Sequence, residues 1–211
     1  MDEQTKLFIE KLLPAESEAE QALRLYAEEN RVPILRSDAA AFMRTLVSLK
    51  KPMRILEVGT AIGYSSILMS ECCLQSKIDT IEIDPDSVVL ARENIRKAGK
   101  ADKIRVIAGD GAEVMSALKQ PYDMIFMDAA KGQYINLYED AMRLLNIGGL
   151  LVCDNCIFYG KVFDKPEDAP HKHRTIVTNL RAFLEKMMTD DRLKASLLDV
   201  GDGMAIATRI K

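Results

Sequence analysis

The sequence predicts an α/β protein with a doubly wound, mostly parallel sheet of seven strands. Two observations support this prediction. From residue 54 onward, short apolar strand segments alternate with helical segments, and two final β segments are joined by Gly201-Asp202-Gly203. Parallel strands are apolar on both faces because helices cover both faces of the sheet. The Gly-Asp-Gly turn indicates that the last two strands form a C-terminal antiparallel hairpin.

The expected elements follow one another without a low-complexity linker. Strands are predicted at residues 54–58, 78–83, 104–108, 122–127, 150–153, 194–199 and 204–210. Helices are predicted between them at residues 64–73, 86–98, 111–118, 134–145 and 175–188. Gly148 and Gly149 are expected to end the helix that precedes the fifth strand.

The N-terminal part is expected to differ from the rest of the chain. Residues 1–50 are predicted to form a helical arm packed on a single core domain at residues 51–211. Its first helix, at residues 2–30, should break near Pro14, and Ser37-Asp38 is expected to cap a second helix. The apolar stripe of this arm is typical of a packing or dimer element, so we expect a homodimer.

Composition narrows the class of protein. With 211 residues, 48% hydrophobic residues and a net charge of −3, the chain is an ordinary globular domain without a generally basic surface. No apolar run approaches the roughly 20 residues of a membrane span, and the first residues do not resemble a signal peptide. Four cysteines at these spacings indicate reduced thiols and a cytoplasmic protein rather than a disulfide framework or a zinc site.

A Gly-rich turn follows the first predicted strand. Gly59 and Gly63 bracket the turn, and a helix opens directly after it, so backbone N–H groups point toward a ligand. Glu57 adds a carboxylate that disfavours phosphate and favours a cationic or hydroxyl-rich ligand. The candidate binding residues here are Glu57, Gly59, Thr60, Gly63 and Ser65. We therefore expect an adenosyl ligand that carries positive charge.

Two later strand ends complete this predicted ligand site. Glu82 lies about 20 residues beyond the turn, where a carboxylate accepts both ribose hydroxyls. Asp110, with the backbone of Gly111 and Ala112, is placed to meet an adenine edge, although capping of the next helix is the alternative. Asp84 is expected to cap its helix ahead of Pro85. Because the G-x-G-x-x-G pattern is absent, S-adenosylmethionine is favoured over a nicotinamide or flavin.

A second set of polar residues follows the fourth and fifth strands. If these strands are neighbours, Asp128, Asp154 and Asn155 converge, because adjacent strands lie about 5 Å apart. An all-oxygen ligand set of this kind suits Mg²⁺, or another hard divalent cation, better than Zn²⁺. Lys131 lies at the same rim, where a dication would lower its pKa toward that of a useful base. A solvated lysine at a helix start is the alternative.

These motifs together resemble a known family. The chain is similar to class I, metal-dependent O-methyltransferases of the catechol and caffeoyl-coenzyme A type, which have a Rossmann-like methyltransferase sheet. Within the family it looks most like the bacterial tRNA 5-hydroxyuridine methyltransferases. The resemblance is carried by the segments at residues 57–65, 81–84, 127–134, 154–162 and 201–203.

The resemblance implies a function and roles for the site residues. Asp128, Asp154 and Asn155 would hold Mg²⁺, Lys131 would lie beside the acceptor hydroxyl, and Glu82 would bind ribose. The implied reaction transfers a methyl group from S-adenosylmethionine to 5-hydroxyuridine at the tRNA wobble position. A small-molecule phenol such as a catechol is the alternative acceptor, and a non-catalytic cofactor-binding protein is a second alternative.

A tRNA anticodon loop would need phosphate contacts. The candidates are Arg31, Arg36, Lys161, Lys165, Lys172 and Arg174. Four aromatic side chains could stack on a splayed base: Phe158, Tyr159, His171 and His173. The alternative is an acceptor loop with ordinary surface charges, since residues 159–174 also carry Asp164, Glu167 and Asp168.

Overall fold

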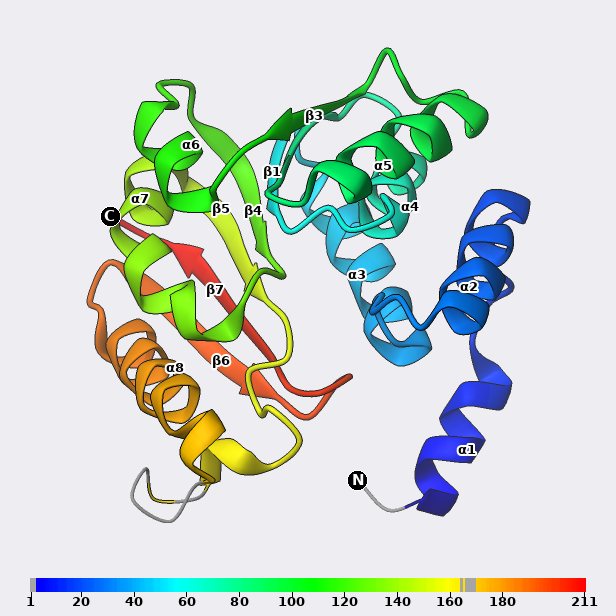
Figure 1. Ribbon diagram of the computed structural model, residues 1–211. Coiled ribbons are helices and arrows are strands. Elements are labelled where there is room, and N and C mark those ends of the chain that lie inside the picture. Colours follow the sequence, from blue (N-terminus) through cyan, green and yellow to red (C-terminus); the bar gives the residue numbers. More distant parts are fainter. Residues whose placement is uncertain (1–2, 164, 166–169) are drawn as a thin grey trace.

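The computed structural model describes residues 3–163, 165 and 170–211, which form a sheet flanked by helices (Figure 1). The strand order is β3-β2-β1-β4-β5-β7-β6. The first five strands are parallel, while β7 runs antiparallel to both β5 and β6. The predicted seven-stranded, doubly wound sheet with its antiparallel C-terminal hairpin is confirmed.

Most element bounds agree with the predicted segments to within one residue, but β5 begins five residues earlier than predicted and α8 four residues earlier. The strands are β1 (Arg54–Val58), β2 (Lys77–Glu82), β3 (Ile104–Ala108), β4 (Tyr122–Met127), β5 (Leu145–Cys153), β6 (Leu193–Leu198) and β7 (Met204–Arg209). The α-helices are α1 (Glu3–Leu12), α2 (Glu18–Asn30), α3 (Ser37–Lys50), α4 (Tyr64–Cys72), α5 (Pro85–Lys97), α6 (Gly111–Ala117), α7 (Tyr134–Leu144) and α8 (His171–Thr189). Two short 3₁₀ helices are η1 (Lys131–Gln133) and η2 (Lys161–Phe163).

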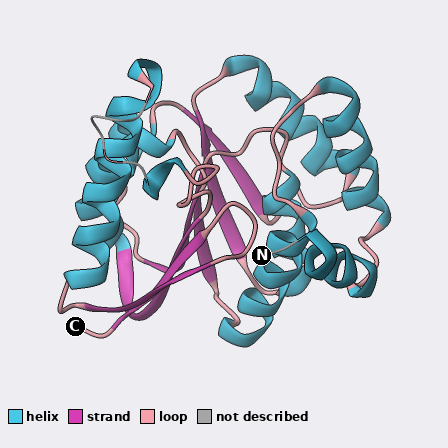
Figure 2. Ribbon diagram, turned by 90° about the horizontal axis from the view of Figure 1, so that it is seen from below, coloured by secondary structure: helices cyan, strands magenta, loops and turns pink. Residues whose placement is uncertain are grey.

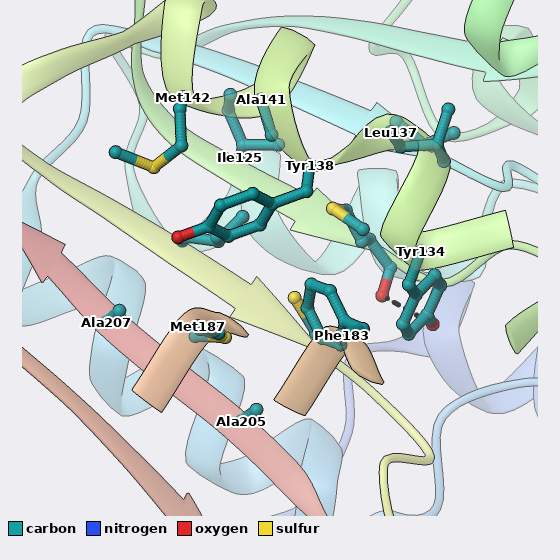
Figure 3. Close-up of a cluster of buried hydrophobic side chains, with 14 of the residues drawn as sticks. Ile125, Tyr134, Leu137, Tyr138, Ala141, Met142, Phe183, Met187, Ala205 and Ala207 are labelled. Carbon is teal, nitrogen blue, oxygen red and sulfur yellow. Dashed lines mark hydrogen bonds between the residues drawn. The ribbon is translucent and has the colours of Figure 1, made fainter. Parts of the chain in front are cut away.

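Helices cover both faces of the sheet (Figure 2). One core lies beneath α6, α7 and α8, where the ring of Phe183 meets Tyr134 edge-on at a centroid distance of 5.4 Å and Tyr138 at 6.0 Å (Figure 3). The other core joins α2, α3, α4 and α5 to the opposite face of the strands. Since both faces are buried, the strands need no alternation of polar and apolar residues.

The N-terminal helices break and pack as their sequence indicates. α1 ends before Pro14 and α2 begins after a capping box, in which Ser17 and Glu20 each bond the other's backbone N–H. Leu23 and Ala27 of α2 are buried in the same core as Ile55 of β1. The division into an arm and a core domain nevertheless stays a prediction.

Two expectations about element ends were wrong. β5 begins at Leu145 and therefore includes Gly148 and Gly149, because α7 stops at Leu144 and the chain becomes extended at once. Ser37-Asp38 does not cap α3. The Asp38 carboxylate instead accepts the N–H groups of Ala39 and Gly201, at 2.9 and 3.0 Å, and ties the start of α3 to the β6–β7 turn.

No helix within the described part of the chain combines the length and the apolar character that crossing a bilayer demands.

Candidate active site at the carboxyl ends of the strands

The strand order reverses at β1, which lies between β2 and β4. Ligands of doubly wound sheets bind at the carboxyl ends of the strands around such a reversal. Here the turn after β1 touches the end of β4. Gly59 has a φ of +104°, and a Cβ at this position would overlap the Asp128 carbonyl oxygen and lie 2.7 Å from its carbon. Only glycine permits this approach.

Glu57 lies beneath the turn and is fully buried. Its carboxylate accepts hydrogen bonds from the hydroxyls of Ser65 and Ser66, and from that of Thr80 at 2.6 Å. The Thr60 hydroxyl lies 2.6 Å from that of Thr80 and shares a hydrogen bond with it. Burial raises the pKa of Glu57 to about 7, although the three hydroxyls oppose this. Glu57 therefore supports the turn from below, and its predicted contact with the cofactor remains a prediction.

Glu82 lies at the end of β2 and faces the same turn. Its two carboxylate oxygens accept the backbone N–H of Ala61 at 2.8 Å and that of Asp84 at 2.9 Å. The side chain is therefore held in one orientation while remaining partly exposed. Asp84 caps α5 through the N–H of Ser87 at 2.8 Å, with Pro85 at the first helical position, as predicted.

The end of β3 carries Asp110, which caps α6. Its Oδ1 accepts the N–H groups of Ala112 at 2.8 Å and Glu113 at 3.3 Å. The capping alternative is therefore present in the structure. The contact of Asp110, Gly111 and Ala112 with an adenine stays a prediction.

The ends of β4 and β5 bring the predicted acidic residues together. Met127 is paired in register with Cys153, so Asp128 and Asp154 follow directly on neighbouring strands. Asp154 is 3% exposed, and burial together with the nearby charge of Asp128 raises its pKa. Lys131 Nζ forms an ion pair with Asp128 Oδ1 at 2.7 Å.

Asn155 completes this edge of the sheet. It is partly exposed, adopts a φ of +53°, and donates its N–H to Asp154 Oδ1 at 2.7 Å. Two carboxylates and an amide therefore gather at one strand edge, a donor set that fits a hard divalent cation. Within the described residues there is no cluster of three or more His, Cys, Asp or Glu side chains suited to a metal, so Asn155 or outside oxygens would have to complete the ligand set of the two carboxylates.

Two functional candidates were missed by the sequence interpretation. The Tyr134 hydroxyl is buried and lies 3.0 Å from the carbonyl oxygens of both Met127 and Asp154, so it braces the two strand ends. Asp202, in the hairpin turn, holds the segment after Asn155. Tyr134 belongs to a motif that the sequence did reveal, but nothing local in the sequence indicates the long-range partners of Asp202.

The predicted RNA-binding residues are distributed over several elements. Arg31 is exposed at the end of α2, while Arg36 donates to the Gly201 carbonyl at 3.1 Å. Lys161 lies over the Phe158 ring at 4.9 Å, and Lys165, Lys172 and Arg174 are exposed. The acids Asp164, Glu167 and Asp168, weighed as neighbours of these cations, lie outside the described residues.

The cysteines agree with the prediction of reduced thiols. All four are free, and Cys153 and Cys156 are buried in the core. Burial raises the pKa of Cys156 to about 12, which removes the reactive thiolate that a redox pair would need.

Comparison with known proteins defines the class. The sequence matches the O-methyltransferase family over residues 15–210, and the chain belongs to this family. A catechol O-methyltransferase of Niastella koreensis is 34% identical over 176 residues, which make up 79% of this chain and 77% of that protein. A caffeoyl-CoA O-methyltransferase of Populus kitakamiensis is 30% identical over 181 residues, or 82% of this chain and 77% of that protein.

Solved structures agree with this assignment. The O-methyltransferase TomG of Streptomyces achromogenes, in complex with SAM, has a TM-score of 0.85 and 26% identity, and all of both chains is covered. An SAH-bound methyltransferase of Podospora anserina has a TM-score of 0.88 and 25% identity, covering 100% of this chain and 97% of that one. The protein is therefore an S-adenosylmethionine-dependent O-methyltransferase.

Proposed function

We propose that this enzyme uses Mg²⁺ to transfer the methyl group of S-adenosylmethionine to the 5-hydroxyl of 5-hydroxyuridine at the tRNA wobble position, giving 5-methoxyuridine. The observation that carries the metal dependence is the Asp128–Asp154 pair, in which one carboxylate is buried beside the other. Such a pair is costly unless cations compensate it, and Lys131 brings only one positive charge to the two carboxylates. The four free thiols are consistent with a cytoplasmic enzyme.

On the donor side, each residue would have a distinct task. Glu82, held by two backbone N–H groups, accepts the ribose hydroxyls. Gly59, Thr60, Gly63 and Ser65 shape the turn around the methionine part, and Glu57 supports it from below. Asp110, Gly111 and Ala112 flank the adenine, and Asp128 borders the site at its joint with the acceptor side.

On the acceptor side, Asp128, Asp154 and Asn155 would hold the cation. When bound there, Mg²⁺ lowers the pKa of a hydroxyl and orients it together with a neighbouring oxygen. Lys131, which forms an ion pair with Asp128 at 2.7 Å as an ammonium group, would orient the acceptor, or would take the hydroxyl proton after giving up its own. The remaining rate enhancement comes from alignment of oxygen, methyl carbon and sulfur.

Exposed cations support an RNA acceptor. Contacts with phosphates require exposed cations, and the exposed ones here are Arg31, Arg36, Lys165, Lys172 and Arg174, with Lys161 partly exposed. The exposed ring of Tyr159 offers a stacking surface for an unstacked base. A catechol-type phenol is the second candidate acceptor, favoured by the 34% identity to the catechol O-methyltransferase of Niastella koreensis.

The acceptor is tested by offering labelled S-adenosylmethionine and Mg²⁺ with either tRNA containing 5-hydroxyuridine or a panel of catechols. We expect label in the tRNA, loss of transfer on chelation, and recovery when Mg²⁺ is restored. tRNA lacking the 5-hydroxyl serves as the control substrate. Turnover of catechols alone would disprove the tRNA acceptor, and transfer that survives chelation would disprove the metal.

The same acceptor can be tested in cells by nucleoside analysis of tRNA from a strain that lacks the gene. We expect 5-methoxyuridine, or any nucleoside derived from it, to disappear and to return with the wild-type gene. Unchanged 5-methoxyuridine in the deletion strain would contradict the proposal. In that case, the enzyme would be assigned to a small-molecule phenol.

A homodimer is part of the proposal. α1 exposes Leu7, Phe8 and Leu12 at 48, 63 and 67% of their surfaces, an apolar stripe that a second copy of the chain would cover. Light scattering of the wild type should give the dimer mass. Phe8→Glu should give the monomer, and a wild-type monomer at micromolar concentration would refute this part.

A further inference from the structure

The segment after β5 has an unusual backbone. Among the six residues of 155–160, Asn155, Phe158 and Tyr159 have φ values of +53°, +50° and +54°, and Gly160 follows at +80°. Side-chain-bearing residues rarely adopt this conformation, least of all aromatic ones. Such a cluster persists only where the surrounding structure determines it, and it commonly occurs at functional sites.

The hairpin turn between β6 and β7 is what holds this segment. The Gly203 carbonyl accepts the N–H of Cys156 at 2.7 Å, and the Asp202 carbonyl accepts that of Ile157 at 2.8 Å. At Gly203, φ is +85° and a Cβ would lie 2.7 Å from the backbone nitrogen of Ile157. The two chain segments are therefore in direct backbone contact.

The Asp202 side chain adds a contact near the far end of the segment. Both of its carboxylate oxygens accept the N–H of Tyr159, at 2.7 and 2.9 Å. Asp202 is 9% exposed, so this charge-assisted bond is largely shielded from water. It fixes the left-handed turn at the point where the chain presents the Tyr159 ring.

The aromatic side chains on this segment differ in exposure. Phe158 packs inward against the core, and its ring meets His173 edge-on at 5.4 Å. Tyr159 is 79% exposed, with its ring 6.1 Å from that of Phe158 and 5.7 Å from Lys161 Nζ. The backbone of Tyr159 is therefore held in place, while its ring stays exposed to solvent.

The turn also lies beside the acidic residues Asp128 and Asp154, which follow the ends of β4 and β5. A Cβ at Gly201 would lie 3.6 Å from Asp154 Oδ1, and Gly201 is tied to α3 through Asp38. Asp202 therefore links the β6–β7 turn, which lies near Asp154, to Tyr159, four residues beyond Asn155.

We propose that Asp202 is a positioning residue for the acceptor: its carboxylate holds the 155–160 segment so that the Tyr159 ring forms a stacking wall for a flat aromatic acceptor. This inference rests on the proposed function for the presence of an acceptor at the Asp128–Asp154 edge. Asp202 itself acts through Tyr159 and does not touch the reacting atoms.

The anchor is tested first without any acceptor, by hydrogen–deuterium exchange of the wild type, Asp202→Ala and Asp202→Asn. We expect peptides covering 155–163 to exchange at least tenfold faster in Asp202→Ala and less so in Asp202→Asn, which keeps one acceptor oxygen. Peptides from β4 should be unchanged. Asp191→Ala, which removes an exposed aspartate paired with Lys211, is the matched control. Unchanged exchange at 155–163 would overturn the anchor.

The role in acceptor binding is tested by steady-state kinetics with whichever acceptor the wild type methylates. For Asp202→Ala we expect an approximately tenfold higher KM for the acceptor, kcat within threefold, and Kd for S-adenosylhomocysteine within twofold. In a Tyr159→Ala background the Asp202→Ala change should add less than threefold, because the two residues act as one unit. A full additional tenfold loss there would overturn the inference, as would an equal loss of S-adenosylhomocysteine binding.

These outcomes are separable from failure of the proposed function. If the wild type methylates neither tRNA nor catechols, the proposed acceptors are wrong, and the exchange measurement still decides whether Asp202 anchors the segment.

Discussion

Two buried carboxylates lie near the carboxyl ends of β1 and β5, the two neighbours of β4 in the sheet, and their surroundings differ sharply. Glu57 of β1 accepts hydrogen bonds from three hydroxyls, those of Ser65, Ser66 and Thr80. Asp154, after β5, accepts the N–H of Asn155 and faces a second carboxylate, Asp128. On the cofactor side the chain therefore surrounds Glu57 with hydrogen-bond donors, whereas on the acceptor side it places beside Asp154 a second carboxylate, Asp128, which is paired with Lys131.

This difference implies that the two sides respond differently to substitution. Residues around Glu57 should affect cofactor binding and stability, because they complete a network made within the chain. Residues around Asp154 should affect transfer and metal binding while sparing the fold. Gly59 belongs to both sides, because it lies against the Asp128 carbonyl.

The largest effect is expected for Asp154→Ala. Loss of one proposed metal ligand should lower kcat/KM for methyl transfer by about 10³-fold or more, because a metal bound there would supply several kcal/mol of stabilisation. Binding of S-adenosylhomocysteine, measured by calorimetry, should stay within threefold. Asp191→Ala serves as the control for loss of an exposed aspartate. Unchanged transfer and unchanged metal binding would show that Asp128, Asp154 and Asn155 do not form the metal site.

Gly59→Ala should be the next most damaging change. The added Cβ would meet the Asp128 backbone at a φ of +104°, so strain and overlap should together cost about 3 kcal/mol of unfolding free energy. Both cofactor binding and transfer should fall. Gly99→Ala is the matched control, because Gly99 has a φ of +68° with nothing within 4 Å and should cost only about 1 kcal/mol. Equal losses in denaturant unfolding would argue against a close approach at Gly59.

The convergence of Asp128 and Asp154 was predictable from the sequence, because it depends only on the order of the strands. A doubly wound parallel sheet makes β4 and β5 neighbours, and residues that follow aligned strands must meet, as Asp128 and Asp154 do. Asp84 as a helix cap and the hairpin at Gly201–Gly203 were likewise predictable, since their partners are local in the sequence.

The sequence could not reveal partners that depend on register or on distant segments. Thr80 reaches Glu57 because the two residues are paired across β1 and β2, a fact that the sequence of either strand does not contain. Asp202 bonds Tyr159 across a separation of 43 residues. Asp38 was mistaken for a cap because one of its two partners, Gly201, is 163 residues away in the sequence.

Lys131→Ala tests whether the acceptor side also provides a proton acceptor. We expect kcat to fall by about 10²-fold, the lower end of the contribution from a positioned acid or base. Affinity for S-adenosylhomocysteine should be unchanged. Lys131→Arg keeps the ion pair with Asp128 but cannot act as a base, so recovery of kcat by arginine would assign Lys131 an orienting role. Full activity of Lys131→Ala would remove it from the proposed mechanism.

The smallest effect, and the most direct test of the cofactor side, concerns Glu57 and pH. Its pKa is raised from an ordinary 4.5 to about 7 by burial, so between these values the folded state holds a proton that the unfolded chain releases. Wild-type stability should therefore fall as pH rises from 5 to 8, by about 2 kcal/mol from this group. Glu57→Gln lacks the titrating group, so its unfolding free energy should not show this fall. Between pH 5 and pH 8, the difference between the two proteins should therefore shift by about 2 kcal/mol in favour of the variant. Denaturant unfolding at pH 5, 6, 7 and 8 measures this shift. If the difference in unfolding free energy stays constant with pH, the hydrogen bonds from Ser65, Ser66 and Thr80 fully offset the cost of burying the Glu57 charge. The surroundings of Glu57 and Asp154 would then differ even more than the raised pKa of Glu57 indicates.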